Sequence, residues 1–294
     1  MNMKVDLCGV TLNNPVMTAS GTFGSGAEYA EFVDLNKLGA VVTKGVANVP
    51  WPGNPTPRVA EVYGGMLNAV GLQNPGIDLF VERDIPFLKQ FDTKIMVNVC
   101  GHSTEEYIEV VERLRDQPVD LLEINISCPN VNEGGIAFGP DPKAVEAITK
   151  EMKKHAAQPV IMKLSPNVTD ITEMARAAEA GGADGLSLIN TITGMKIDIN
   201  RQKFVLANKT GGMSGPAIHP AAVRMVYQTA QAVRLPIVGM GGIMNAEDAI
   251  EMILAGATAV SVGTANFTNP HVTEEIVAGI RDYMERYQVA DIRD

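Results

Sequence analysis

Three kinds of residue in this sequence could do chemistry: a cysteine in a polar motif, two lysines that end apolar runs, and paired glycines. Cys128 stands in the motif Asn-Ile-Ser-Cys-Pro-Asn130, where its thiolate could act as a base if it ionises near working pH. A lone cysteine is more often a small buried hydrophobic residue, and we interpret Cys8 and Cys100 in that way. Cys128 differs because it follows the end of a predicted strand, so we interpret it as a candidate base.

Lys163 ends the run Val-Ile-Met-Lys, and Lys44 ends a second apolar run. Three roles are open to such lysines: a hydrogen bond to a cofactor oxygen, a Schiff base with a carbonyl substrate, or a structural ion pair. Schiff-base chemistry needs a pKa lowered by desolvation or by a neighbouring cation, and a second lysine keeps that role open.

Glycines end the last two predicted strands, as Gly241-Gly242 and as Gly263 before Thr264. Glycine lets backbone N–H groups approach an anion, and barrel enzymes often bind phosphate after their seventh and eighth strands. Gly215, in a Ser-Gly-Pro turn, could complete this cradle. Glycine pairs also form ordinary tight turns, but their position here favours a phosphate site.

Asparagines and histidines are the remaining polar candidates. Asn68, Asn125 and Asn190 each offer a donor and an acceptor, which suits a planar imide or amide substrate. Asn68 could equally well form a turn. The four histidines show no metal-ligand spacing, so we expect no metal site and we expect surface or loop positions for His102, His155, His219 and His271.

Short apolar runs bounded by Gly, Pro or Asn must position these side chains. They predict eight strands that are buried on both faces: Val16–Ser20, Ala40–Lys44, Ile95–Val99, Leu121–Ser127, Val160–Leu164, Gly185–Asn190, Pro236–Gly239 and Ala259–Gly263. Amphipathic helices are expected between them, with a capping box at Ser103–Glu106 and further helix starts at His219-Pro220, Asn245 and Asn269-Pro270.

Eight strand–helix repeats predict a single α/β domain over residues 1–294, a (β/α)8 TIM barrel, with a doubly wound sheet as the alternative. The connections 45–75, 127–140 and 191–215 are too long for simple turns, and we expect them to be active-site loops on the C-terminal face. Within the last, Lys196–Ile199 and Phe204–Ala207 could pair as a hairpin. A second hairpin, Val5–Cys8 with Val10–Leu12, is expected to close the opposite end of the barrel.

Composition excludes several classes of protein. The net charge of −10 argues against a general nucleic-acid binder, and no apolar run is long enough for a membrane span. The start MNMKVDLCGV lacks the apolar segment of a signal peptide. Three widely spaced cysteines indicate a reducing, cytoplasmic setting, and without C-x-x-C spacing they should hold neither an iron–sulfur cluster nor structural zinc.

Four motifs carry a resemblance to a known family. The segments 14–26, 67–76, 125–130 and 238–243, which read NPVMTASGTFGSG, LNAVGLQNPG, NISCPN and VGMGGI, resemble the catalytic subunits of class 1B, NAD-dependent dihydroorotate dehydrogenases. The resemblance covers essentially the whole chain, and the first two motifs in combination are specific to that class. It implies a flavin mononucleotide (FMN)-dependent oxidation of (S)-dihydroorotate to orotate in de novo UMP biosynthesis.

The resemblance also implies roles for residues at matching positions, and no functional position departs from the family pattern. Cys128 would be the catalytic base, where membrane-bound class 2 relatives have serine. Lys163 would offset the negative charge of reduced flavin. The implied FMN contacts are Ser20, Lys44, Gly45, Asn98, Asn125, Lys163, Ile189, Gly215, Gly241, Gly242, Gly263 and Thr264. The implied substrate contacts are Lys44, Asn68, Ala69, Val70, Gly71, Leu72, Asn125, Asn190 and Thr191.

The family further implies one non-covalent FMN per chain and a homodimer of this chain. An iron–sulfur flavoprotein subunit carrying FAD and [2Fe–2S] would join it, giving a heterotetramer of two catalytic and two partner chains that reduces NAD⁺. Two rival functions stay open: a uracil-like substrate, as in the related barrel of dihydropyrimidine dehydrogenase, and a Schiff-base lyase that uses Lys163 or Lys44. A non-catalytic binding role is the least favoured.

Overall fold

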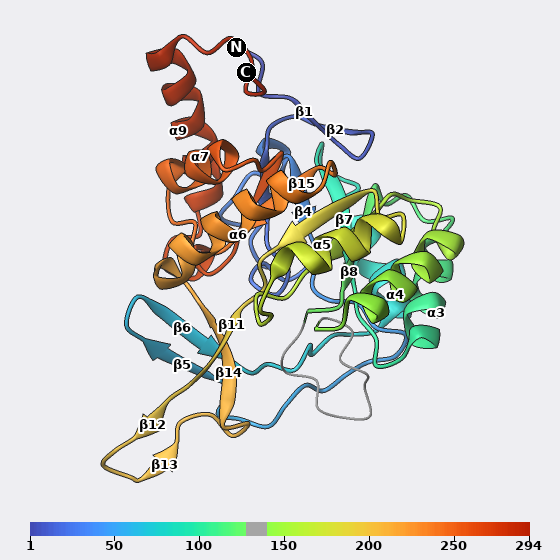
Figure 1. Cartoon of the computed structure of the whole chain (residues 1–294), viewed down its shortest axis with the longest axis vertical. Helices are drawn as coiled ribbons and strands as arrows, with labels where there is room; N and C mark the ends of the chain where they lie inside the picture. Colours follow the sequence, from blue (N-terminus) through green and yellow to red (C-terminus); the bar gives the residue numbers. More distant parts are fainter. Residues whose placement is uncertain (128–139) are drawn as a thin grey trace.

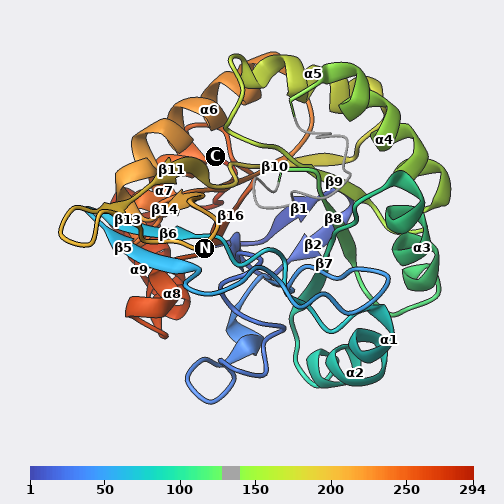
Figure 2. The ribbon, with the colours of Figure 1, turned by 90° about the horizontal axis from the view of Figure 1, so that it is seen from below.

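Eight parallel strands close into a barrel in the computed structural model, which describes residues 1–127 and 140–294 (Figures 1 and 2). The predicted barrel is therefore confirmed and the doubly wound sheet is wrong. Neighbouring strands follow one another along the chain, and the last pairs with the first. In spatial order they are β3 (Val16–Thr18), β4 (Ala40–Val42), β7 (Lys94–Val99), β8 (Leu121–Asn125), β9 (Val160–Lys163), β10 (Gly185–Leu188), β15 (Ile237–Met240) and β16 (Ala259–Val262).

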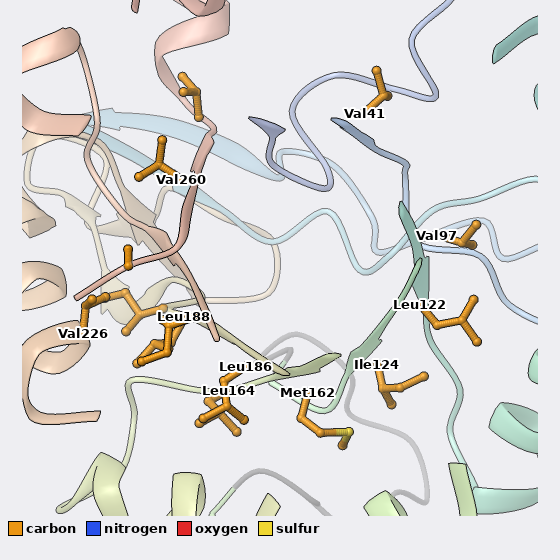
Figure 3. Close-up of a cluster of buried hydrophobic side chains, with 14 of the residues drawn as sticks. Val41, Val97, Leu122, Ile124, Met162, Leu164, Leu186, Leu188, Val226 and Val260 are labelled. Atoms are coloured by element: carbon orange, nitrogen blue, oxygen red, sulfur yellow. The ribbon is translucent and has the colours of Figure 1, made fainter. Parts of the chain in front are cut away.

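Each barrel strand buries both of its faces, which is why the predicted strands read as continuous apolar runs. Met17, Met96 and Ile161 point into the barrel and form one apolar cluster. The alternate residues, such as Val97 and Met162, point outward and pack under the surrounding helices (Figure 3).

Helices surround the barrel on all but one of its connections. The longer ones are α3 (Thr104–Leu114), α4 (Pro142–His155), α5 (Ile171–Ala180), α6 (His219–Ala232), α7 (Ala246–Leu254) and α9 (Val272–Tyr287). The connection from β3 to β4 holds only the short η1 (Leu35–Lys37), and α9 packs against β3 and α7. Shorter helical stretches complete the set: α1 (Ile77–Leu79), η2 (Phe80–Asp84), α2 (Ile85–Leu88), η3 (Pro216–Ile218) and α8 (Ala265–Thr268).

The helix starts largely follow the capping signals in the sequence. Ser103 Oγ accepts from the Glu106 backbone N–H at 3.3 Å, but the Glu106 carboxylate returns to the N–H of His102 rather than to that of Ser103. The first hydrogen bond of the predicted capping box is therefore present, and the second is made to the residue before Ser103. Asn245 caps α7 as predicted, and α6 begins at His219. The last long helix begins at Val272, three residues beyond the predicted start.

A two-stranded hairpin closes the N-terminal end of the barrel, as predicted. It consists of β1 (Val5–Leu7) and β2 (Val10–Leu12). Val5, Leu7 and Leu12 join the apolar cluster inside the barrel. The chain termini meet at this same end, where the Asn2 backbone N–H donates to the Ala290 carbonyl (Figure 1).

A four-stranded antiparallel sheet stands over the opposite, C-terminal end (Figure 1). Two of the long connections predicted as active-site loops supply its strands, which were not predicted. Connection 45–75 contains β5 (Val59–Val62) and β6 (Gly65–Asn68), and connection 191–215 contains β11 (Ile192–Met195) and β14 (Thr210–Ser214). The predicted hairpin within the second connection is confirmed with shorter strands, β12 (Ile197–Asp198) and β13 (Lys203–Phe204).

Among residues 1–127 and 140–294, no helix is long and apolar enough to cross a membrane.

Candidate active site

One cleft lies over the C-terminal ends of the barrel strands, bounded on its far side by residues of β5, β6 and β14. Its volume is about 1180 Å³, counting the space at its open mouth. Parallel strands of a barrel deliver all of their C-terminal ends to this face, so side chains far apart in the sequence meet here.

Most of the predicted cofactor residues line this cleft: Ser20, Lys44, Asn125, Lys163, Ile189, Gly215, Gly241, Gly242, Gly263 and Thr264. Gly45 and Asn98 do not line it. Asn98 is fully buried beneath the cleft, and a Cβ on Gly45 would lie 3.2 Å from the Asn98 amide oxygen. These two residues therefore form part of the floor rather than of the lining.

Two glycine turns converge at one end of the cleft. Gly215, Gly241 and Gly242 have φ angles of +106°, +127° and +70°, a region that side chains rarely adopt. A Cβ on Gly242 would lie 2.7 Å from the Gly215 carbonyl oxygen, so the two turns are in close contact only because they carry no side chains.

Hydroxyl groups add to this end of the cleft. Thr264 Oγ1 donates to Ser214 Oγ at 2.7 Å, which joins the end of β14 to the residues after β16. Glycine turns with two hydroxyls form a donor set that suits phosphate oxygens.

Ser261 places a buried hydroxyl in the wall of the cleft. The residue is 1% exposed, and its Oγ has no hydrogen-bond partner among the described residues. Buried polar atoms are nearly always hydrogen-bonded in folded proteins. An unpartnered hydroxyl at this position fits a polar ligand that reaches into the barrel.

Lys163 is the last residue of β9, lines the cleft and forms an ion pair with a residue buried below the cleft. Its Nζ lies 3.5 Å from Oε2 of Glu123, a residue of β8 that is 1% exposed. Asn98 and Ser187 donate to the same carboxylate at 2.5 and 2.7 Å. The ion pair is one of the three roles that the sequence leaves open for Lys163.

Glu123 is not among the residues predicted for the site, although the sequence carries a signal for it. The run Leu121-Leu-Glu-Ile-Asn125 is otherwise apolar up to its end, and position 123 shares its strand face with Leu121 and Asn125. An acidic residue on the inward face of a buried strand needs a partner, and that requirement points to the barrel interior.

Asparagines form the middle of the cleft. Asn125 Nδ2 donates to Asn98 Oδ1 at 3.3 Å, and the Tyr107 hydroxyl donates to the Asn125 carbonyl at 2.6 Å. Asn190 Nδ2 donates to Ser127 Oγ at 2.8 Å, and Asn190 Oδ1 accepts from the Thr191 N–H. Both asparagines therefore hold fixed orientations.

The predicted substrate residues also gather here, with one exception. Lys44, Asn68, Val70, Gly71, Leu72, Asn125, Asn190 and Thr191 line the cleft. Ala69 does not, because its side chain packs with Leu67 and Leu206 in a small cluster under the antiparallel sheet. Asn68 ends β6 and pairs with Val59 and Gly212, so the alternative of a turn there is wrong.

The sequence predicts different settings for the three cysteines. Cys128, the predicted base, lies outside the described residues, as does most of the connection 127–140. Cys100 is fully buried as predicted, whereas Cys8 is only partly buried.

The expectation of a surface or loop position is wrong for His219, which lies in the first turn of α6 and is 7% exposed. Its Nδ1 lies 2.8 Å from the Gly241 carbonyl oxygen, and its Nε2 lies 3.2 Å from a Glu251 carboxylate oxygen. Asp248 lies close to the same nitrogen. The ring therefore holds the glycine turn after β15 against α6 and α7, an arrangement between distant segments that sequence spacing does not reveal.

Comparison with known proteins agrees with this geometry. Residues 2–284 match the family model of dihydroorotate dehydrogenase. The chain is 71% identical to a protein named dihydroorotate dehydrogenase B (NAD(+)), catalytic subunit, from Lachnoclostridium phytofermentans, covering all of this chain and 98% of that one. A protein of the same name from Alkaliphilus metalliredigens is 65% identical over all of this chain and 97% of its own.

A solved structure shares the fold. A dihydroorotate dehydrogenase from Eimeria tenella, crystallised with ferulenol, superposes with a TM-score of 0.82 at 22% identity, covering all of this chain and 87% of that one. The family model and the two close relatives span almost the entire sequence. The chain belongs to the dihydroorotate dehydrogenase family.

Proposed function

We propose that this chain oxidises (S)-dihydroorotate to orotate with a bound FMN, in de novo synthesis of UMP. The observation that carries the proposal is the single cleft that gathers glycine turns, a lysine and several amide side chains from different strands. The names of the 71% and 65% identical relatives supply the substrate.

FMN fits the cleft by the chemistry of its donors. The turns at Gly215, Gly241 and Gly242, with Thr264, would hold the phosphate. Lys163 would face the flavin ring, where its charge offsets the negative charge of the reduced form. Ser261 supplies a buried hydroxyl for a polar atom of the cofactor.

The residues of the chain orient the substrate and move one proton. Asn68, Asn125 and Asn190 would hold the planar pyrimidine and its carboxylate, with Lys44 offsetting the negative charge. Cys128 would take the proton from C5, and the C5–C6 bond becomes the double bond of orotate. When bound, FMN supplies the two-electron acceptor for the hydride that leaves C6.

The electrons would leave through a second subunit. The relatives are named catalytic subunits, which supports a partner that carries the remaining redox chemistry. We infer an iron–sulfur flavoprotein with FAD and [2Fe–2S], assembled with a homodimer of this chain into a heterotetramer that reduces NAD⁺ in the cytoplasm.

The test begins with the visible spectrum of the purified chain, which is expected to be yellow with one FMN per chain. Dihydroorotate should bleach this flavin in anaerobic stopped-flow measurements. Cys128→Ala should slow the bleaching by about 10²–10⁴-fold, the usual contribution of a general base. Cys8→Ala is the matched control, because Cys8 lies at the opposite end of the barrel.

Three results would contradict the proposal. A colourless protein that takes up no added FMN would contradict the assignment of FMN as the cofactor. Equal bleaching rates in wild type and Cys128→Ala would contradict the assignment of Cys128 as the base. Faster reduction by dihydrouracil than by dihydroorotate changes the substrate.

One observation disfavours a Schiff base at Lys163. A Schiff base requires a neutral amine, whereas the Glu123 carboxylate 3.5 Å from Lys163 Nζ stabilises an ammonium. Borohydride trapping of a carbonyl substrate on lysine, in a colourless protein, would restore that alternative.

A further inference from the structure

A charged side chain lies inside the barrel directly beneath the cleft. Glu123 occupies the middle of β8, between Leu121 in the apolar interior and Asn125 in the cleft wall. It is 1% exposed and does not line the cleft itself. A buried carboxylate destabilises a fold unless its neighbours compensate it, so an apolar residue would serve stability better at this position.

Three donors surround the Glu123 carboxylate. Asn98 Nδ2 lies 2.5 Å from Oε2, Ser187 Oγ lies 2.7 Å from Oε1, and Lys163 Nζ lies 3.5 Å from Oε2. An ionised carboxylate only accepts hydrogen bonds. Asn98 must therefore turn its NH₂ group toward Glu123 and its carbonyl oxygen away from it.

A series of side-chain hydrogen bonds connects Asn98 to the cleft. Asn98 Oδ1 accepts from Asn125 Nδ2 at 3.3 Å, and Asn125 Oδ1 accepts from Ser127 Oγ at 3.0 Å. Ser127 Oγ in turn accepts from Asn190 Nδ2 at 2.8 Å. Every bond runs in the same direction, with its donor on the side away from Glu123. Reversing the Asn98 amide would set two donors or two acceptors against each other. Farther along, the Ser127 and Thr191 backbone N–H groups also bind Oδ1 of Asn125 and of Asn190, so the constraint from Glu123 is direct for Asn98 and reaches Asn125 through it.

We propose that Glu123 is a positioning residue of this site with two roles. Its acceptor oxygens fix the orientation of Asn98, whose carbonyl oxygen in turn holds the NH₂ group of Asn125 in the cleft wall. Its charge also balances that of Lys163, which lines the cleft. The inference rests on the proposed function, since both roles concern the proposed substrate and cofactor.

Charge balance has a consequence for the redox equilibrium. An unbalanced Lys163 ammonium would favour the anionic, reduced flavin more strongly than the oxidised one. Glu123 therefore limits how firmly electrons are retained, which helps their passage to the next acceptor.

Glu123→Gln tests the charge while preserving shape. The Gln carbonyl can still accept from Asn98 and Lys163, and the Ser187 hydroxyl can rotate to accept from the new NH₂ group. We expect the equilibrium of bound flavin to shift at least tenfold toward the reduced form, about 30 mV for a two-electron couple. Orotate affinity should stay within about threefold of wild type. A dye-coupled anaerobic redox titration and an absorbance titration with orotate measure these quantities.

Two further variants separate the roles. Ser187→Ala removes an uncharged contact from the same carboxylate, so the redox equilibrium should stay within about threefold of wild type. Glu123→Met has a similar length but no acceptor, so Asn98 is released. Orotate binding to its flavin-loaded form should weaken at least tenfold.

Each of the two proposed roles of Glu123 has an experimental outcome that would overturn it. A Glu123→Gln protein that holds FMN with an unchanged redox equilibrium overturns the charge role, and a Glu123→Met protein with wild-type orotate affinity overturns the orienting role. If Glu123→Met does not fold, Asn98→Leu, which removes the same contact to Asn125, decides the orienting role by its orotate affinity, and wild-type affinity overturns that role. A wild-type chain that binds no flavin instead overturns the proposed function, and is recognised before any variant is compared.

Discussion

At the scale of single residues, burial decides which side chains are available for chemistry. Cys8 illustrates this at the N-terminal end of the barrel, where burial raises the pKa of its thiol to about 12 and the nearby Asp184 charge adds to the effect. The thiolate is the reactive form of cysteine. Cys8 should therefore be inert despite being only partly buried.

Alkylation of Cys8 tests this expectation. At pH 9 roughly a thousandth of the native thiol would be ionised, whereas about half would be ionised in the unfolded chain, where the thiol pKa is about 9.0. Iodoacetamide should therefore label Cys8 at least about a hundredfold more slowly in the native protein than in urea, measured by peptide mass spectrometry. Equal rates in the two states would rule out the raised pKa.

The same shift predicts how stability depends on pH. The pKa of Cys8 is higher in the folded state than in the unfolded state. Its contribution to stability is therefore complete below about pH 9 and is lost as pH rises toward 12. Cys8→Ala should remove this part of the alkaline destabilisation, as measured by urea unfolding across that range.

At the scale of elements, the hairpin β1–β2 can pack against the barrel end because the barrel strand β10 begins with a glycine. A Cβ added to Gly185, the first residue of β10, would lie 2.7 Å from Cys8 Sγ and 3.2 Å from the Pro236 carbonyl oxygen. The backbone of β10 therefore approaches the turn of the hairpin too closely for a side chain.

Gly185→Ala should destabilise the protein by about 1–3 kcal/mol, the usual cost of overpacking. Cys8→Ala should recover part of that loss, because it removes the nearest clashing atom. Urea unfolding of both single variants and of the double variant measures the coupling. Strictly additive effects would show that the hairpin does not rest on β10.

The elements themselves could be predicted where the sequence pattern is local. The eight barrel strands are continuous apolar runs, and Asn245 carries its own capping signal, so both are placed correctly. The sheet over the cleft was missed because β6 pairs with β14, from a connection more than a hundred residues away. Short strands such as β5 have no local pattern strong enough to reveal that pairing.

The same distinction applies to the candidate site. Lysines, glycines and asparagines at strand ends could be predicted to meet, because barrel topology alone brings them together. The position of Glu123 on the inward face of its strand could have placed it in the barrel interior, but its pairing with Lys163 and the contact of His219 with Glu251 join different elements and could not be assigned. The resemblance implies FMN contacts for Gly45 and Asn98 and a substrate contact for Ala69, but none of the three lines the cleft.

At the scale of the whole molecule, the sequence lacks the parts that would pass electrons to a nicotinamide. Its three cysteines have no cluster-binding spacing, and it has no Gly-x-Gly-x-x-Gly dinucleotide fingerprint. The cleft that would hold the proposed flavin is bordered by residues of the antiparallel sheet, so we expect an electron acceptor to reach the flavin through the open side of this cleft.

The purified chain should therefore reduce NAD⁺ poorly while reducing a small artificial dye readily, with dihydroorotate as the donor in both assays. Assembly with the proposed iron–sulfur flavoprotein subunit should raise the NAD⁺ rate. It should leave the rate of flavin bleaching by dihydroorotate nearly unchanged, because the proposed partner acts only after the first half-reaction. Stopped-flow bleaching and steady-state NADH formation, measured on the same preparations, separate the two steps. Rapid NAD⁺ reduction by the isolated chain would contradict this division of labour and would place a nicotinamide site within the chain itself.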